Sequence, residues 1–113
     1  MDPDSVVVVS VTTPPDIASS IAHALVEKRL AACVNIVPTV TSVYRWEDKV
    51  EEDQESLLLI KTTAVMFETV SATVRELHPY AVPEIMSTPI EDGYEGYVRW
   101  VRDNVGVQEP KDG

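Results

Sequence analysis

Residues 31–61 read AACVNIVPTVTSVYRWEDKVEEDQESLLLIK and predict one long β-hairpin. The apolar and β-branched residues of its first arm are typical of a strand, and Pro38 interrupts that arm. Because proline has no amide hydrogen to donate to a sheet, we expect a bulge or an edge position there. Glu47 and Asp48 stand at the tip, where aspartate tolerates the left-handed conformation of a tight turn. The outer half of this hairpin is acidic.

The segment before the hairpin predicts a strand followed by a helix. Residues 6–11 form an almost unbroken β-branched run, which is typical of a strand buried on both faces. Thr13 is a candidate N-cap, Pro14 suits the first helical position, and Asp16 completes the spacing of a capping box. We expect this helix to end near Leu30.

The segment after the hairpin predicts a second helix, a short strand and a last helix. Thr62 or Thr63 caps the second helix, which Pro79 stops, and the strand lies around residues 85–87. Gly93 precedes the last helix. Apolar residues at helical spacing mark the two buried faces: Phe67, Val70, Val74 and Leu77 in the second helix, and Tyr94, Tyr97, Val98, Val101 and Val105 in the last.

The predicted order of elements is β-α-β-β-α-β followed by a terminal helix. This order is that of the split βαβ, ferredoxin-like α+β fold, an antiparallel sheet with two helices on one face. A chain of 113 residues has the length of one domain, so we expect a single domain over 1–113. We expect an ordered core over about residues 5–107 and a frayed polar tail over 108–113.

The charge balance excludes several classes of partner. The chain has 9 Lys and Arg against 19 Asp and Glu, a formal net charge of −10. Proteins that bind nucleic acid need basic side chains to displace counterions from phosphates, so we expect no nucleic-acid partner and no anionic membrane surface. No apolar run is long enough to span a membrane. The single cysteine, Cys33, cannot form an internal disulfide, and a cytoplasmic location is the default expectation.

Six segments form an ordered series along the chain: LAACVNI at 30–36, SVYRW at 42–46, KVEE at 49–52, ESLLLIKT at 55–62, HPYAVPEI at 78–85 and GYEGYVRW at 93–100. This series resembles the CutA1 family of divalent-cation tolerance proteins. The single-domain chain is therefore similar to CutA1. Asp48 departs from the family pattern, in which this turn usually carries glycine.

The resemblance implies a ferredoxin-like fold, a homotrimer built through the long hairpins, and a role in tolerance to divalent metal ions, with copper as a possible cofactor. It also implies a structural likeness to trimeric PII-type signalling proteins. Tyr44 and Trp46 lie near the tip of a hairpin that one small chain can hardly cover. Since exposed aromatic residues on an uncovered strand favour contact with another chain, we expect both at the trimer interface.

Cys33 and His78 are the candidate metal ligands. A thiolate favours Cu(I), an imidazole suits copper, and the resemblance implies a copper-ligand role for the cysteine. The alternative for Cys33 is a small buried apolar residue, and for His78 a cap at the C-terminus of the second helix.

A cleft between subunits is a second candidate site, because the resemblance places five residues at its border: Lys61, Tyr80, Glu84, Tyr97 and Trp100. Such a cleft would take a small molecule. The alternative is that Lys61 and Glu84 form a structural ion pair while the aromatic residues pack against another subunit.

The chain lacks the short motifs of the common enzyme classes. It has no phosphate-binding glycine loop, no Gly-x-Ser-x-Gly, no His-Glu-x-x-His and no Cys-x-x-Cys. We therefore expect no enzyme. Three functions remain: a trimeric metal-binding or metal-responsive tolerance protein, a PII-like trimer that binds a small molecule or nucleotide between subunits, and a scaffold for a protein partner.

Overall fold

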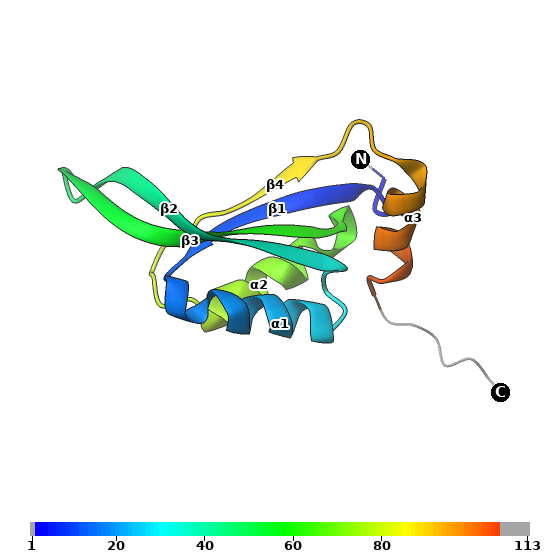
Figure 1. The fold of residues 1–113 in the computed structure, drawn as a ribbon, viewed down its shortest axis with the longest axis horizontal. Helices are drawn as coiled ribbons and strands as arrows, with labels where there is room; N and C mark the ends of the chain where they lie inside the picture. Colours follow the sequence, from blue (N-terminus) through cyan, green and yellow to red (C-terminus); the bar gives the residue numbers. More distant parts are fainter. Residues whose placement is uncertain (1, 107–113) are drawn as a thin grey trace.

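The computed structural model describes residues 2–106, so the expected tail at 108–113 and residue 107 lie outside the described residues. The chain forms four strands and three α-helices (Figure 1). Their bounds are β1 Val6–Thr13, α1 Ala18–Glu27, β2 Cys33–Trp46, β3 Lys49–Thr63, α2 Phe67–Leu77, β4 Ile85–Pro89 and α3 Glu95–Asp103. Two short 3₁₀ helices, Pro15–Ile17 and Ala64–Met66, precede α1 and α2.

The strands form one antiparallel sheet in the order β2-β3-β1-β4. Helices α1 and α2 cover one face of this sheet, and α3 lies at one end of it (Figure 1). The arrangement confirms the expected ferredoxin-like α+β fold with an additional C-terminal helix. Strands β2 and β4 are the two edges.

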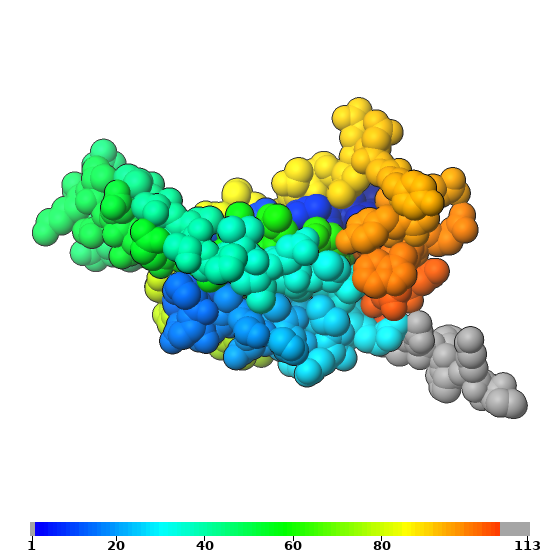
Figure 2. Space-filling view, viewed as in Figure 1, coloured from blue at the N-terminus to red at the C-terminus, as the bar shows by residue number. Residues whose placement is uncertain are grey.

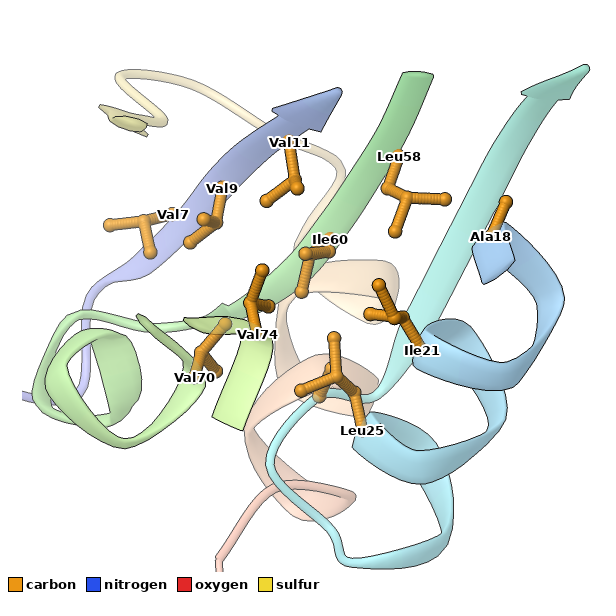
Figure 3. Close-up of a cluster of buried hydrophobic side chains, with 11 residues drawn as sticks. Val7, Val9, Val11, Ala18, Ile21, Leu25, Leu58, Ile60, Val70 and Val74 are labelled. Carbon is orange, nitrogen blue, oxygen red and sulfur yellow. The ribbon is translucent and has the colours of Figure 1, made fainter. Parts of the chain in front are cut away.

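The core lies between the sheet and the helices α1 and α2. Alternate residues of β1 and β3 point toward the helices and meet apolar residues from both of them (Figure 3). The members of this cluster are Val7, Val9, Val11, Ala18, Ile21, Leu25, Ala31, Leu58, Ile60, Val70 and Val74. Full burial of a side chain such as Leu25 stabilises the fold by about 1.5–3 kcal/mol.

The hairpin of β2 and β3 is longer than the rest of the sheet. Strand β3 has 15 residues, which corresponds to about 50 Å of extended chain. Its first six residues, from Lys49 to Gln54, are all exposed. The outer half of the hairpin therefore projects beyond the body of the molecule (Figure 2).

The two irregular points of the hairpin lie where they were expected. Glu47 and Asp48 form a two-residue turn with φ angles of +49° and +65°. The pairing of β2 with β3 shifts between Val37 and Val40, which is the bulge expected at Pro38. At the turn, the left-handed conformation that glycine accepts freely is imposed on two non-glycine residues.

The expected helix starts were wrong. Thr13 does not cap a helix, because it is the last residue of β1, pairs with Ser56, and donates its hydroxyl to the Pro14 carbonyl oxygen. Helix α1 begins only at Ala18, and it has no side-chain cap. Thr62 and Thr63 belong to β3; Thr63 does occupy the N-cap position of the short helix that leads into α2, but its side chain makes no cap bond. In both places the strand pairing extends further than the propensity pattern indicated.

The ends of the helices also differ from the expectation. Helix α1 stops at Glu27, short of Leu30, because Arg29 takes a left-handed conformation with φ of +60°. Leu77 is 45% exposed, since it is the last residue of α2, where the chain leaves the core. Tyr94 precedes α3 and is 82% exposed, so it lies outside the buried face of that helix, which centres on Val101.

Helix α3 is bound to the rest of the fold by hydrogen bonds. The Gly106 amide donates to the Arg29 carbonyl oxygen at 2.8 Å, and Arg29 Nε donates to the Gly106 carbonyl oxygen at 3.2 Å. Arg102 Nε donates to the Asp4 carbonyl oxygen at 2.9 Å. None of the helices within residues 2–106 is long and apolar enough to cross a membrane.

Candidate functional site

The face of the sheet opposite α1 and α2 carries the candidate site residues, and we call it the open face. Because residues paired across antiparallel strands point to the same side, Cys33 shares this face with its partner Lys61. The other open-face residues of the inner sheet alternate with the core residues: Val8, Ser10, Thr12, Asn35, Val37, Leu57, Leu59 and Met86. They are partly or fully exposed in the single chain.

Cys33 lies at the end of the sheet next to α3. Its side chain is partly buried and lies close to the Tyr97 side chain. Burial raises the pKa of Tyr97, and the neighbouring Cys33 raises it further. The rings of Tyr97 and Trp100 stack with centroids 5.7 Å apart. The thiol is therefore neither a core residue nor fully exposed.

Lys61 belongs to this same end of the sheet. Its ammonium group donates a hydrogen bond to the Asn35 side-chain oxygen. Within the described residues of one chain, no salt bridge joins Lys61 to Glu84; the salt bridge found there joins Arg99 to Glu95 on α3.

His78 lies at the other end of the sheet and is 6% exposed. Its Nε2 lies 2.8 Å from the Thr12 carbonyl oxygen, to which it donates, while Nδ1 accepts the Tyr80 amide at 3.2 Å. The rings of His78 and Tyr80 meet edge to face, with centroids 4.7 Å apart. Both ring nitrogens thus have partners within the chain, and a metal ion would have to displace one of them.

Cys33 and His78 do not come together in one chain. Cys33 pairs with Lys61, and Thr12, the partner of His78, pairs with Leu57, four residues along β3. Four residues of a strand span about 14 Å, so the two side chains cannot share one ion. No group of three or more His, Cys, Asp or Glu side chains among residues 2–106 is placed to hold a metal ion.

A cavity of about 630 Å³ lies between the outer hairpin and the loop from α2 to β4, and we call it the hairpin cavity. Its lining comprises Thr12, Ser42, Val43, Tyr44, Trp46, Asp53, Glu55, Tyr80, Ala81, Val82 and Glu84. Of the five predicted cleft residues, Tyr80 and Glu84 line this cavity, whereas Lys61, Tyr97 and Trp100 do not. A single chain therefore divides the predicted cleft between the two ends of the sheet.

The predicted interface residues Tyr44 and Trp46 also line the hairpin cavity. Both are exposed, at 40% and 49%. The Tyr44 hydroxyl donates a hydrogen bond to the Asp53 carboxylate, and this bond and the nearby negative charge raise the pKa of Tyr44 to about 12. The bond holds one aromatic side chain against the acidic strand.

Sequence reasoning missed Asp53 and Glu55 as individual site residues and Asn35 as the partner of Lys61. The alternation along β3 places Asp53 and Glu55 on the same face as Leu57 and Lys61, and this pattern was present in the sequence. The register of the two strands was not, because it depends on the bulge at Pro38.

Comparison with known proteins identifies the family. The family model described as CutA1 divalent ion tolerance protein matches residues 6–104. The chain belongs to the CutA1 family. It is 55% identical over 100 residues to the divalent-cation tolerance protein CutA of Thermus thermophilus, and the match covers 88% of this chain and 97% of that protein.

Other CutA1 relatives include longer proteins. The chain is 48% identical to human protein CutA over 101 residues, which cover 88% of this chain and only 56% of the human protein. Among solved structures, CutA1 of Thermus thermophilus superposes with a TM-score of 0.87 at 54% identity, covering 89% of this chain and 99% of that one. CutA1 of Oryza sativa superposes with a TM-score of 0.88 at 38% identity, covering 92% and 96%.

Proposed function

We propose that this CutA1 protein acts as a homotrimer in divalent-cation tolerance and binds copper through Cys33. The observation that carries the proposal is the position of Cys33 on the open face, partly buried beside the Tyr97 side chain. Thiolate is the soft ligand that copper prefers, and a partly buried position limits competing water. Membership of a family named for divalent ion tolerance supports the metal role.

The ligand set within one chain does not complete a copper site. Residues 2–106 offer no group of three metal-ligating side chains, and His78 is engaged by Thr12 and Tyr80. The proposal therefore requires ligands from more than one copy of the chain or from solution. The partly exposed open face supports such an assembly, because it leaves Leu57, Leu59 and Met86 in contact with water.

Replacement of the single thiol tests the copper proposal. The Cys33→Ser variant should lose at least tenfold in Cu(I) affinity, measured by competition with a chromogenic chelator. His23→Asn is the matched control, since His23 is an exposed residue of α1 bonded to Ser19. Unchanged copper affinity and stoichiometry in Cys33→Ser would overturn the proposal.

A second candidate is a PII-like trimer that binds a small molecule between subunits. The hairpin cavity favours it, because Tyr80 and Glu84 line that cavity together with both predicted interface residues. Calorimetric titration with nucleotides and small metabolites tests this reading, and a protein that binds copper but none of these would count against it. A scaffold role remains the third candidate, for which the acidic outer hairpin would capture the partner.

The remaining proposals rest on the sequence. We propose a non-catalytic role, supported by the lack of enzyme motifs, and a cytoplasmic location, supported by the single cysteine. One archaeal relative, from Archaeoglobus fulgidus, is described as a periplasmic divalent cation tolerance protein. Fractionation of the native cells tests the location directly.

A further inference from the structure

Helix α3 is too short to be stable by itself. It has nine residues, whereas isolated helices shorter than about 12–15 residues are marginal in water. Val101 is the buried side chain of this helix, and Val98 is partly buried. The position of α3 therefore depends on its attachments to the rest of the fold.

Arg29 attaches the C-terminal end of α3 to the body of the molecule. The Arg29 carbonyl oxygen accepts the Gly106 amide at 2.8 Å, and the Arg29 guanidinium group donates to the carbonyl oxygens of Gly106 at 3.2 Å and Asp103 at 3.4 Å. Because the last carbonyl groups of a helix have no partner within the helix, a cation at this end satisfies them and complements the helix dipole. We call these three hydrogen bonds the Arg29 latch.

The base of the Arg29 latch is fixed to the core. Arg29 has a left-handed φ of +60°, and its amide donates to the Val26 carbonyl oxygen at 3.0 Å. The next two amides, of Leu30 and Ala31, both donate to the carbonyl oxygen of Leu25, whose side chain is fully buried. The latch therefore joins α3 to a turn that cannot move without disturbing the core.

The segment that carries the latch also leads directly to Cys33. Cys33 begins β2, shortly after Arg29 in the chain, and its partly buried side chain lies close to Tyr97 of α3. The rings of Tyr97 and Trp100 stack with centroids 5.7 Å apart. The aromatic pair of α3 therefore adjoins the thiol, and the latch that holds α3 is anchored next to it.

The N-terminal end of α3 follows an exposed loop. The Ile90 amide is bonded to the Val6 carbonyl oxygen at 3.3 Å, and residues 90–94 are all exposed. One further bond to α3 comes from the exposed Arg102, whose Nε donates to the Asp4 carbonyl oxygen at 2.9 Å. Elements with few buried side chains and exposed hydrogen bonds open locally, at a lower free energy than global unfolding. We therefore expect α3 to move about residues 90–94 when the latch opens.

We propose that α3 is a hinged cover for Cys33, held closed by the Arg29 latch and opening about the loop at residues 90–94. In the closed state Tyr97 lies against the thiol, and in the open state the thiol is accessible from solution. The cover regulates access to the proposed copper ligand, so its purpose rests on the proposed function, whereas its existence is tested without copper.

The rate at which Cys33 reacts with the thiol reagent DTNB tests the proposal on the full chain in its native assembly. Cys33 is the single cysteine, so the released thionitrobenzoate reports on this thiol alone. Arg29→Lys keeps the positive charge but loses the planar fork of donors, and it should raise the rate about tenfold. Arg99→Lys is the matched control, because the Arg99 guanidinium pairs with Glu95 of the same helix, and its rate should stay within about twofold of the unaltered protein.

A second variant loosens the latch from its other side. Gly106 has φ of +92°, and a Cβ built there meets no atom of the described residues within 4 Å. Gly106→Ala therefore strains the backbone without a steric clash, and it should also raise the DTNB rate. The urea dependence of the rate guards against a general fold defect. Opening of α3 alone exposes little surface, so the rate in Arg29→Lys should rise less steeply with urea than global unfolding does.

Three results would overturn the hinged cover. A thiol that reacts as fast as free cysteine in the unaltered protein is not covered at all. Equal rates in Arg29→Lys and the unaltered protein mean that a neighbouring subunit, rather than α3, controls access. A rate that follows global unfolding in urea means that the thiol is reached only in the unfolded chain. Because the assay contains no copper, unchanged copper affinity in Cys33→Ser would overturn the copper proposal and leave the cover standing.

Discussion

A side-chain hydrogen bond couples the chemistry of Tyr44 and Asp53. They lie on the same face of the outer hairpin, where Tyr44 is opposite Glu51 and Ser42 is opposite Asp53. The hydrogen bond from the Tyr44 hydroxyl to Asp53 stabilises the protonated phenol, because ionisation would place a second negative charge beside the carboxylate.

The hydrogen bond between Tyr44 and Asp53 predicts that the stability of the protein depends on pH. The pKa of Tyr44 is raised from 10.0 to about 12 in the folded protein, so the bond contributes its full stability below pH 10 and loses it as the pH rises through about 12. Asp53→Asn should lower the pKa of Tyr44 toward 10.0, measured by NMR titration with ring-labelled tyrosine. Glu52→Gln is the control, because Glu52 lies on the opposite face of β3, and this variant should leave the pKa of Tyr44 raised. A Tyr44 pKa that is the same with and without Asp53 would contradict the assignment.

His78 is a candidate metal ligand whose two ring nitrogens already have hydrogen-bond partners within the chain. Its ring joins the end of β1, through the Thr12 carbonyl, to the loop between α2 and β4, through the Tyr80 amide. The hydrogen bonds therefore hold the loop that forms one wall of the hairpin cavity.

Removal of the His78 ring should destabilise the protein without affecting copper. His78→Leu leaves two backbone groups without partners, which should cost about 1–3 kcal/mol of unfolding free energy in urea. The exposed His23 serves as the control, and His23→Gln should change the free energy by less than about 0.5 kcal/mol. A tenfold loss of copper affinity with unchanged stability would instead make His78 a ligand.

At the scale of elements, the hairpin turn is the strained part of β2 and β3. Glu47 and Asp48 both adopt left-handed φ angles, as two-residue hairpin turns require. For a non-glycine residue, contact between Cβ and the backbone destabilises this left-handed conformation, and the destabilisation is smaller for aspartate than for most residues.

Glycine at position 48 should therefore stabilise the hairpin. Asp48→Gly relieves the Cβ contact at φ of +65° and should raise the unfolding free energy by up to about 1 kcal/mol, after the greater chain entropy of glycine is subtracted. Asp48→Val, the control, should lower it. Both are measured by thermal unfolding at one protein concentration, and a loss of stability in Asp48→Gly would show that the aspartate side chain itself holds the turn.

At the scale of the whole molecule, a single chain leaves a large part of its apolar surface bare. Trp46, Val43 and Val50 are exposed on the hairpin, and Met86 is exposed on the open face. Both edge strands, β2 and β4, also lack a partner on one side. These surfaces support the proposed homotrimer, since exposed apolar patches and free strand edges favour association.

Measurement of the mass of the assembly in solution tests the proposed trimer. The unaltered protein should sediment at about three times the chain mass of 12.5 kDa. Trp46→Glu places a charge in the expected interface and should shift the protein toward the monomer. Val65→Glu is the control, because Val65 is 61% exposed at the other end of β3 from the hairpin tip. A monomeric unaltered protein would contradict the assembly.

The sequence by itself determined the order of elements, the bulge at Pro38 and the two-residue turn at Glu47 and Asp48. These features follow from local chemistry: the β-branched runs, the missing proline amide and the tolerance of aspartate for positive φ. The same local reasoning failed at Thr13 and at Thr63, because strand pairing held both residues in the sheet.

Only the tertiary structure decided how the candidate residues group. The strand register and the turn from α2 to β4 bring Tyr44, Glu55, Tyr80 and Glu84 to one cavity, and they separate Cys33 from His78 by about 14 Å of sheet. The physical reason is that side-chain proximity across strands depends on pairing between residues far apart in the chain, which no local pattern specifies.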